Sequence, residues 1–326
     1  MKHHGRRALI GNIILLLASI VWGFAFVAQK DAASHLDHFS VNMFRFLIGG
    51  IVLIPACIAA DAIRKNGRRL FSPKNKNFFG INRAELIGGS LCGVFLCLAS
   101  NLQQLSMNQT SPGKAAFLTA LYSIIVPIFA LFRGKRVKAN AWIAVGVAVV
   151  GAYLLTMYGA EGGFGISPIE IVLLSCSVLF AVHITIIDIF ADKVDGIRLS
   201  IIQFFVAGLL SAPFALAQGA LTADSFVKGL PALLFLGLLS CGVGYTFQII
   251  GQQLSDNPTV VSIILSLESV FGALGGVLFG MEPAMTIPQL IGCALILSAV
   301  ALSQINFGKK QKLPTADSAS DPTNTP

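Results

Sequence analysis

The sequence has few charged residues. Asp, Glu, Lys and Arg make up only 12% of its 326 residues, about half of the roughly 25% that is usual in soluble domains. Hydrophobic residues make up 55%, and the mean hydropathy is +0.78. A single soluble core cannot absorb so much apolar sequence, whereas a bilayer takes up about 20 mostly apolar residues per crossing helix. The composition therefore excludes an ordinary soluble domain and predicts an integral membrane protein.

Patterns of nucleotide, metal and catalytic sites are also missing. There is no GxxxxGK[ST] loop, which argues against ATP as the energy source. The six cysteines lie inside apolar runs without a CxxC pair, and no histidines stand at metal-ligand spacing, so we interpret the cysteines as packing residues. Paired acids or His/Asp clusters of an enzyme are not evident. We expect no cofactor, no metal and no enzymatic activity.

Ten apolar segments are long enough to cross a bilayer. Lipid offers backbone groups no hydrogen-bond partners, and the period-2 alternation of barrel strands is absent, so these segments are predicted to be helices. The sequence therefore predicts an all-α integral membrane fold with ten transmembrane helices. The segments cover residues 8–29, 39–60, 85–106, 112–132, 140–158, 167–190, 199–218, 229–250, 257–280 and 286–306.

Lysine and arginine gather on one side of this topology. If the N-terminus is cytoplasmic, inside regions hold 19 of them and outside regions only Lys30, Lys114 and Lys228. Both termini are therefore predicted to be cytoplasmic in a multi-pass protein of the cell membrane, with a bacterial inner membrane as the expected location. The topology explains the net charge of +8. We therefore expect membrane lipid as a partner and do not expect nucleic acid. Residues 307–326 are polar and are predicted to form a disordered cytoplasmic tail.

The two halves of the chain resemble each other. Residues 110–136 can be laid on 257–282 at an offset of 146, and the alignment continues into the next helix. Five helices is an odd number, so the second half must enter the membrane from the opposite side. The sequence therefore predicts two inverted five-helix repeats, residues 8–158 and 167–306, an arrangement that suits a carrier alternating around a midplane site. The aligned pairs are Pro112 with Pro258, Ser123 with Ser269, Gly134 with Gly280, Arg136 with Glu282 and Gly146 with Gly292.

Five segments together resemble the drug/metabolite transporter superfamily, EamA type. They are LLLASIVWGFAF (15–26), RFLIGG (45–50), LQQLSMNQTSPGKAAFLTALY (102–122), FQIIGQQLSDNPT (247–259) and LESVFGAL (267–274). The resemblance implies ten helices, a central cavity between the halves, and carriage of metabolites, amino acids or toxic compounds, often as export. Two positions depart from the family pattern: Arg136 stands where an acidic residue is common, and Ser269 replaces a common proline. The second departure predicts a straighter ninth helix.

Glu268 is the first candidate for a functional residue. It lies near the middle of a predicted transmembrane helix, where an ionisable side chain costs roughly 2.5 to 3.5 kcal/mol on insertion scales. It is interpreted either as a proton-coupling group or contact for a cationic solute, or as a structural residue paired with Arg45 or Lys114 or bonded to nearby serines.

Other polar and aromatic residues of the spans complete the candidate solute site. Gln103 and Gln248 hold matching places in the two repeats, and Tyr245 and Gln248 lie on one helical face with Cys241 and Gln252. Each polar residue has an alternative role in interhelical hydrogen bonding, and Arg45, which resembles an arginine of the family, could snorkel to the interface. The candidates for a cavity lining are Trp22, Gln103, Tyr122, His183, Tyr245, Gln248 and Glu268.

Together these features predict a secondary-active transporter of small metabolites, either amino-acid-like or drug-like. The resemblance favours export, and the inverted repeats favour alternating access. The alternatives are a membrane-embedded enzyme acting on a lipid-linked substrate, and a receptor or scaffold without transport. GxxxG spacings at Gly89/Gly93 and at Gly272/Gly276/Gly280 favour internal helix packing, with a homodimer contact as the other possibility.

Overall fold

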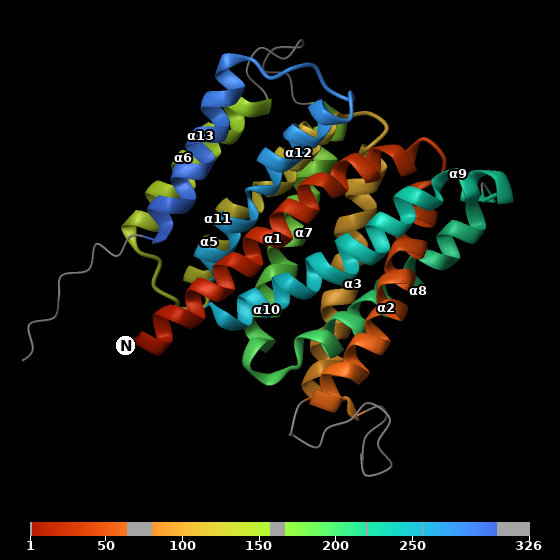
Figure 1. Cartoon of the computed structure of the whole chain (residues 1–326), viewed down its shortest axis with the longest axis horizontal. Coiled ribbons are helices and arrows are strands. Elements are labelled where there is room, and N and C mark those ends of the chain that lie inside the picture. The colour runs from red at the N-terminus through yellow and green to blue at the C-terminus, as the bar shows by residue number, and fades with distance from the viewer. Residues whose placement is uncertain (1, 64–79, 157–166, 220, 256, 305–326) are drawn as a thin grey trace, which may run out of the picture.

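The computed structural model describes residues 2–63, 80–156, 167–219, 221–255 and 257–304, and the predicted tail at 307–326 lies outside them. Regular structure in the described ranges is helical (Figure 1). In chain order, the helices are α1 (Lys2–Ala33), α2 (His38–Ile63), α3 (Arg83–Ser106), α4 (Pro112–Ala120), α5 (Tyr122–Phe132), α6 (Ala139–Thr156), α7 (Pro168–Phe190), η2 (Ala191–Lys193), α8 (Gly196–Gln218), α9 (Ala223–Leu234), η3 (Phe235–Tyr245), α10 (Thr246–Leu254), α11 (Pro258–Leu265), α12 (Glu268–Leu278) and α13 (Ile287–Gln304).

Eight helical stretches in the described ranges are long and apolar enough to cross a membrane. Two shorter apolar helices, α6 and α13, coincide with the predicted fifth and tenth segments. We number the stretches by the ten predicted segments. The fourth stretch, Pro112–Phe132, consists of α4 and α5, and the ninth, Pro258–Leu278, consists of α11 and α12. The eighth stretch, Ala223–Leu254, runs through α9, η3 and α10. An all-α multi-pass membrane fold follows from this pattern.

The fourth and ninth stretches are interrupted at equivalent positions. α4 ends before Leu121, and α11 ends before Ser266 and Leu267, which lies 146 residues after Leu121. At both places the backbone tightens to three-residue hydrogen bonds, as in Ile124 N–H to Leu121 O and Leu267 N–H to Ile264 O.

The ninth helix, which the sequence predicts to be straighter than usual, is thus interrupted next to Ser269. The hydroxyls of Ser266 and Ser269 donate to backbone carbonyl oxygens three residues earlier, each at 2.7 Å. Such bonds compete with the helical ladder and can bend a helix. Serine thus accompanies an interruption at a position where the sequence comparison considered only proline.

The eighth stretch contains a π-helical segment, η3. π-helical turns are wider than α-helical ones because each hydrogen bond spans five residues, and they are rare outside functional regions. The segment includes Gly237, Gly242 and Gly244, and it packs against α1 and α2. It therefore changes which side chains of this stretch face the centre of the protein.

Helices from the two halves of the chain pack against each other. α2 pairs with α8, α3 with α7 and α8, and α6 with α13, while α1 crosses the middle of the bundle against α10, η3 and α12 (Figure 1). Glycines permit the closest approaches: a Cβ on Gly151 would lie 2.7 Å from the carbonyl oxygen of Gly292. The GxxxG glycines also face other parts of the same chain, with Gly93 against Val206 and Gly272 against Ala116. These spacings therefore serve internal packing in this structure.

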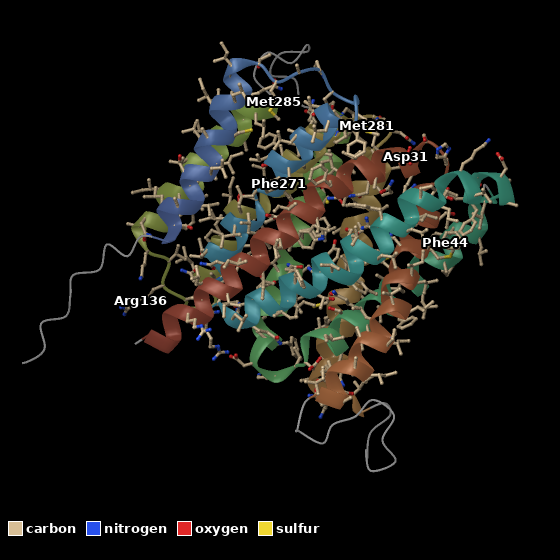
Figure 2. All side chains as sticks on the ribbon, in the orientation of Figure 1. Asp31, Phe44, Arg136, Phe271, Met281 and Met285 are labelled. Atoms are coloured by element: carbon tan, nitrogen blue, oxygen red, sulfur yellow. The ribbon has the colours of Figure 1, made fainter. Side chains whose placement is uncertain are left out.

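The loops after α5 and α12 lie at opposite ends of the bundle. Figure 2 shows Arg136 near the start of α1 and Met281 near its other end. Both loops begin at a glycine with positive φ, Gly134 at 74° and Gly280 at 68°, a conformation that favours glycine. We refer to the two ends of the bundle as the Arg136 end and the Glu282 end.

Candidate functional site: a buried polar cavity

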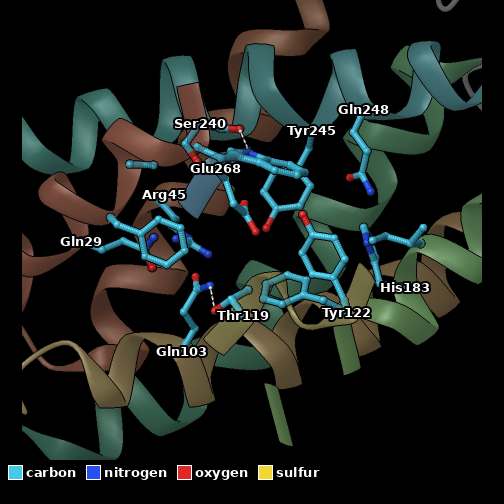
Figure 3. Close-up of a pocket in the computed structure, with 15 residues that line it drawn as sticks. Gln29, Arg45, Gln103, Thr119, Tyr122, His183, Ser240, Tyr245, Gln248 and Glu268 are labelled. Atoms are coloured by element: carbon cyan, nitrogen blue, oxygen red, sulfur yellow. Dashed lines mark hydrogen bonds between the residues drawn. The ribbon is translucent and has the colours of Figure 1, made fainter. Parts of the chain in front are cut away.

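A cavity lies among α1, α2, α3, α4, α5, α7, η3, α10 and α12, and we call it the central cavity. All seven residues predicted to form a solute site line it, and all are buried (Figure 3). Its free volume is about 30 Å³, enough for water but far too little for a metabolite. The residues that complete its lining are Ala25, Phe26, Gln29, Arg45, Thr119, Phe180, Ile184 and Ser240.

Tyr245 is the central aromatic ring of the cavity wall. The ring of Trp22 lies 4.6 Å from it at 58°, and the ring of His183 meets it edge-on at 6.0 Å. The indole Nε1 of Trp22 donates a hydrogen bond of 3.2 Å to the carbonyl oxygen of Ser240 in η3. Gly244 allows this approach, because a Cβ there would lie 2.6 Å from Trp22 Nε1. These contacts give the cavity a rigid aromatic wall.

Two of the four residues on the predicted polar face, Tyr245 and Gln248, line the cavity. In an α-helix Cys241 would share the face of Tyr245, four residues away. In η3, where hydrogen bonding is π-helical, Ser240 lines the cavity with Tyr245, and Cys241 does not. Gln252 also lies outside the lining and donates to the carbonyl oxygen of Ile184 at 3.0 Å.

Glu268 is the first residue of α12, directly after the interruption of the ninth stretch. Its side chain is 3% exposed, and Figure 3 shows its carboxylate and the hydroxyls of Tyr122 and Tyr245 pointing into the same space. Oε1 of Glu268 has no hydrogen-bond partner among the described residues. Nor does an ion pair within the described ranges join it to Arg45 or to Lys114, which pairs with Glu170. The structural pairing considered for Glu268 is thus not formed.

Arg45 is fully enclosed, with 1% of its surface exposed. Its guanidinium carbon lies 4.6 Å from the centre of the Phe46 ring, and its Nε has no hydrogen-bond partner in the described part of the chain. Snorkelling is therefore excluded for the conformation seen here. Sequence position alone was misleading because it gives depth along a helix but not which neighbours cover the side chain.

Gln103 and His183, two further polar residues of the cavity, each make one side-chain hydrogen bond. Gln103 Nε2 donates to Thr119 Oγ1 at 3.1 Å, and His183 Nε2 lies 3.0 Å from Gln203 Oε1. The second ring nitrogen of His183 and the Oε1 atom of Gln248 have no protein partner within the described ranges. Buried polar atoms normally have partners, and an unmade bond costs about 1 to 3 kcal/mol. Polar atoms at a cavity wall that lack hydrogen-bond partners in the protein suit a site that binds a polar solute.

Two of the overlooked lining residues could have been found from helical spacing. Gln29 follows Trp22 by seven residues, and Thr119 precedes Tyr122 by three, so each shares a face with a predicted residue. Ser240 could not be found this way, because the residue pattern does not predict a π-helical segment. The described residues contain no group of three or more His, Cys, Asp or Glu side chains that could hold a metal.

Several ion pairs lie outside the central cavity and connect parts of the bundle. Buried Arg198 at the start of α8 donates through one nitrogen to both carboxylate oxygens of Asp61 in α2, at 2.8 Å each. At the same end of the bundle as Arg136, Arg133 and Lys135 both pair with Asp188 of α7. These residues form ion pairs, whereas no ion pair within the described ranges involves Arg45 or Glu268.

A multi-pass helical fold around a buried polar cavity is an arrangement that suits a membrane transporter. The chain belongs to the EamA-like transporter family, whose pattern matches residues 9–157 and 167–304. It is a membrane transporter of the drug/metabolite transporter superfamily, and this membership points away from an enzyme.

Related proteins support the same class. The chain is 26% identical over 301 residues to an uncharacterized transporter of Archaeoglobus fulgidus, covering 91% of this chain and 87% of the relative. It is 20% identical over 312 residues to an uncharacterized transporter of Clostridium kluyveri, covering 93% and 94%. A solved crystal structure with 19% identity superposes with a TM-score of 0.68 over 90% of this chain and 96% of its own, and supports the fold.

Proposed function

We propose that this transporter is a secondary-active exporter of a small zwitterionic, amino-acid-like solute. The observation that carries the proposal is that one basic and one acidic side chain line the central cavity. Arg45 and Glu268 are both buried, both line the cavity, and are not joined to each other by an ion pair. A buried charge without a partner is costly, and a solute with one carboxylate and one ammonium group would neutralise both.

The proposed binding mode follows from the donors and acceptors available. The guanidinium of Arg45 offers planar N–H groups that suit a carboxylate, and Glu268 accepts hydrogen bonds from an ammonium group. The rings of Trp22, Phe180 and Tyr245 supply apolar surface for a side chain. A drug-like cation would use Glu268 but leave Arg45 uncompensated, so we favour the zwitterion.

Alternating access around the cavity is the proposed mechanism. The free volume of about 30 Å³ requires the helices to separate before a solute enters. Equivalent interruptions in the fourth and ninth stretches, and equivalent loops at opposite ends of the bundle, support two inverted five-helix repeats with ten crossings. The basic residues support cytoplasmic termini in a bacterial inner membrane. Export rests on the family resemblance.

Substrate discrimination in proteoliposomes tests the proposal. Liposomes containing the purified protein are loaded with an amino-acid mixture, and efflux is followed by mass spectrometry. For a transported amino acid, the wild type should prefer it at least about tenfold over the matching amine and the matching carboxylic acid, since a lost hydrogen bond to a charged group is worth about 1.5 to 3 kcal/mol.

Two variants test which cavity residue recognises the carboxylate of the solute and which recognises its ammonium group. Arg45→Gln should lose discrimination against the amine, and Glu268→Gln should lose discrimination against the acid. Arg83→Gln and Asp224→Asn, which alter exposed residues, should behave as wild type. Wild-type discrimination in both cavity variants, or efflux only of compounds without a carboxylate, would contradict the proposal.

Glu268 is also our candidate for proton coupling. The groups around it are Tyr122 from α5, Tyr245 from η3, and Arg45 and His183 on other walls of the cavity. If Glu268 carries the coupled proton, Glu268→Gln should retain exchange of solute across the membrane but lose net flux driven by a proton gradient. A Glu268→Gln variant with the wild-type rate and pH dependence would remove this role.

A further inference from the structure

Glu282 caps helix α4 from the other half of the chain. Its Oε1 accepts a hydrogen bond of 2.9 Å from the N–H of Gly113, the second residue of α4, across a sequence separation of 169. N–H groups in the first turn of a helix lack partners within the helix, and the helix dipole favours a negative charge there. The carboxylate therefore ties the loop after α12 to the start of the fourth stretch.

Two glycines make room for this carboxylate. A Cβ on Gly276 would lie 2.6 Å from Glu282 Oε2, and a Cβ on Gly113 would lie 2.9 Å from the same atom. Either side chain would push Glu282 away. The contact borders a cavity of about 210 Å³ at the Glu282 end, which Gly113, Lys114 and Glu282 help to line. The capped amide is thus close to a region that water can reach.

The equivalent contact at the Arg136 end is not possible. Moving each residue by the offset of 146 places Thr259 at the position of Gly113 and Arg136 at the position of Glu282. A guanidinium has no hydrogen-bond acceptor, and the N-terminus of α11 repels a positive charge. Thr259 carries a side chain where Gly113 has none, and its N–H donates to the local N-cap residue, Asn257 Oδ1, at 3.0 Å instead of to a residue of the other half. One end of the bundle therefore has a carboxylate cap and the other does not.

We propose that Glu282 is a one-sided latch that makes the two conformations of the carrier unequal in population. The cap stabilises closure of the Glu282 end, and the substitution of arginine at position 136 removes its counterpart. In the proposed orientation the resting carrier is closed to the outside and opens to the cytoplasm. This inference rests on the proposed alternating access, and it identifies Glu282 as a positioning residue that acts through α4.

Hydrogen exchange by mass spectrometry, on solute-free protein in lipid nanodiscs, tests the latch. Glu282→Gln should raise the exchange rate at the start of α4 by about tenfold, as expected for a lost bond to a charged group. It should also slow exchange at the start of α11, because weakening one closure favours the other. If the cap had only a local structural role, Glu282→Gln would not change hydrogen exchange at the start of α11. Asp224→Asn is the matched control, because it neutralises a carboxylate near the N-terminus of a different helix, α9.

A reciprocal variant makes the test independent of Glu282. Asn257 already caps the amide at position 259, so the variant combines Arg136→Glu and Thr259→Gly with Asn257→Ala, which frees that amide for the new carboxylate. Relative to Asn257→Ala alone, it should slow exchange at the start of α11 and raise it at the start of α4. If Glu282→Gln does not fold, Glu282→Asp shortens the side chain and should act in the same direction. Unchanged exchange at the far end in both sets of variants would overturn the latch. Absence of solute efflux by the wild type would instead count against the proposed function, because the exchange measurement uses no solute.

Discussion

Tyr122 and Glu268 hold the same place in two interrupted helices and meet in the central cavity. Each is the first residue after an interruption, as the first residue of α5 and of α12, and they are 146 residues apart. The Tyr122 hydroxyl lies beside the Glu268 carboxylate (Figure 3). A pair of equivalent positions thus places a donor next to the one acidic side chain of the cavity lining.

Tyr122→Phe should lower the maximal transport rate about tenfold or more. The Tyr122 hydroxyl has no hydrogen-bond partner among the described residues in this conformation, so it is free to donate to Glu268 or to the solute during transport, and a hydrogen bond to a charged group contributes about 1.5 to 3 kcal/mol. Initial efflux rates from proteoliposomes measure the effect. Tyr153→Phe, on the exposed side of α6, is the control and should transport normally. Equal rates for both variants would show that the hydroxyl is not used.

Trp22→Phe should abolish a solute-dependent change in tryptophan fluorescence. The sequence has two tryptophans; Trp22 lines the cavity, and Trp142 lies on α6 outside its lining. The Trp142→Phe variant therefore isolates the emission of Trp22, and it should retain the full response to solute. Trp22→Phe should also lower the free energy of unfolding by about 1 kcal/mol, since the bond to Ser240 is lost. A response that disappears with Trp142 would place the solute elsewhere.

Asp61→Asn should destabilise the protein by about 1.5 to 3 kcal/mol, because the buried Arg198 loses its charge-assisted hydrogen bonds to α2 but retains its ion pair with Asp195. Thermal unfolding in detergent gives the loss. The exposed pair of Lys228 and Asp224 offers a comparison, and Asp224→Asn should change the free energy of unfolding by less than about 0.5 kcal/mol. Similar effects of the two substitutions would mean that the buried pair contributes no more than a surface pair.

Gly292→Ala should weaken the contact of α6 with α13, because the new Cβ would collide with the carbonyl oxygen of Gly151 and lie 2.7 Å from the amide nitrogen of Leu155. Gly146→Ala is the matched control: the offset of 146 makes the two glycines equivalent, yet Gly146 has nothing within 4 Å of an added Cβ. Alanine there should stabilise by about 0.5 to 1 kcal/mol. Melting temperatures of both variants would show opposite shifts, and a shared direction would contradict the packing described.

The helical stretches were predictable because apolar length is a requirement of the bilayer. The cavity residues were predictable for a related reason: a polar side chain such as Gln103 or Glu268 inside an apolar span must face protein or water. The sequence pattern could not show that Lys114 pairs with Glu170 rather than with Glu268. That choice depends on where helices distant in sequence come together.

Local hydrogen bonding produced the features that the pattern missed. The interruption of the ninth helix is accompanied by hydroxyl bonds of Ser266 and Ser269 to backbone carbonyl oxygens, and Ser240 lies in a segment with π-helical bonding. Neither changes the hydropathy of its segment. The enclosure of Arg45 depends on packing between the halves, which helical periodicity within one segment does not describe.

The pairing of α6 with α13 has a consequence for how the protein is made. α6 packs mainly against α13, the last described helix, so its partner is synthesised only after residues 157–286 have left the ribosome. Until then, the surface around Gly151 has only lipid or insertion machinery to contact. Assembly of the first half is therefore completed by the end of the second, and nascent chains that stop before Ile287 should remain bound to insertion factors and reach quality-control proteases.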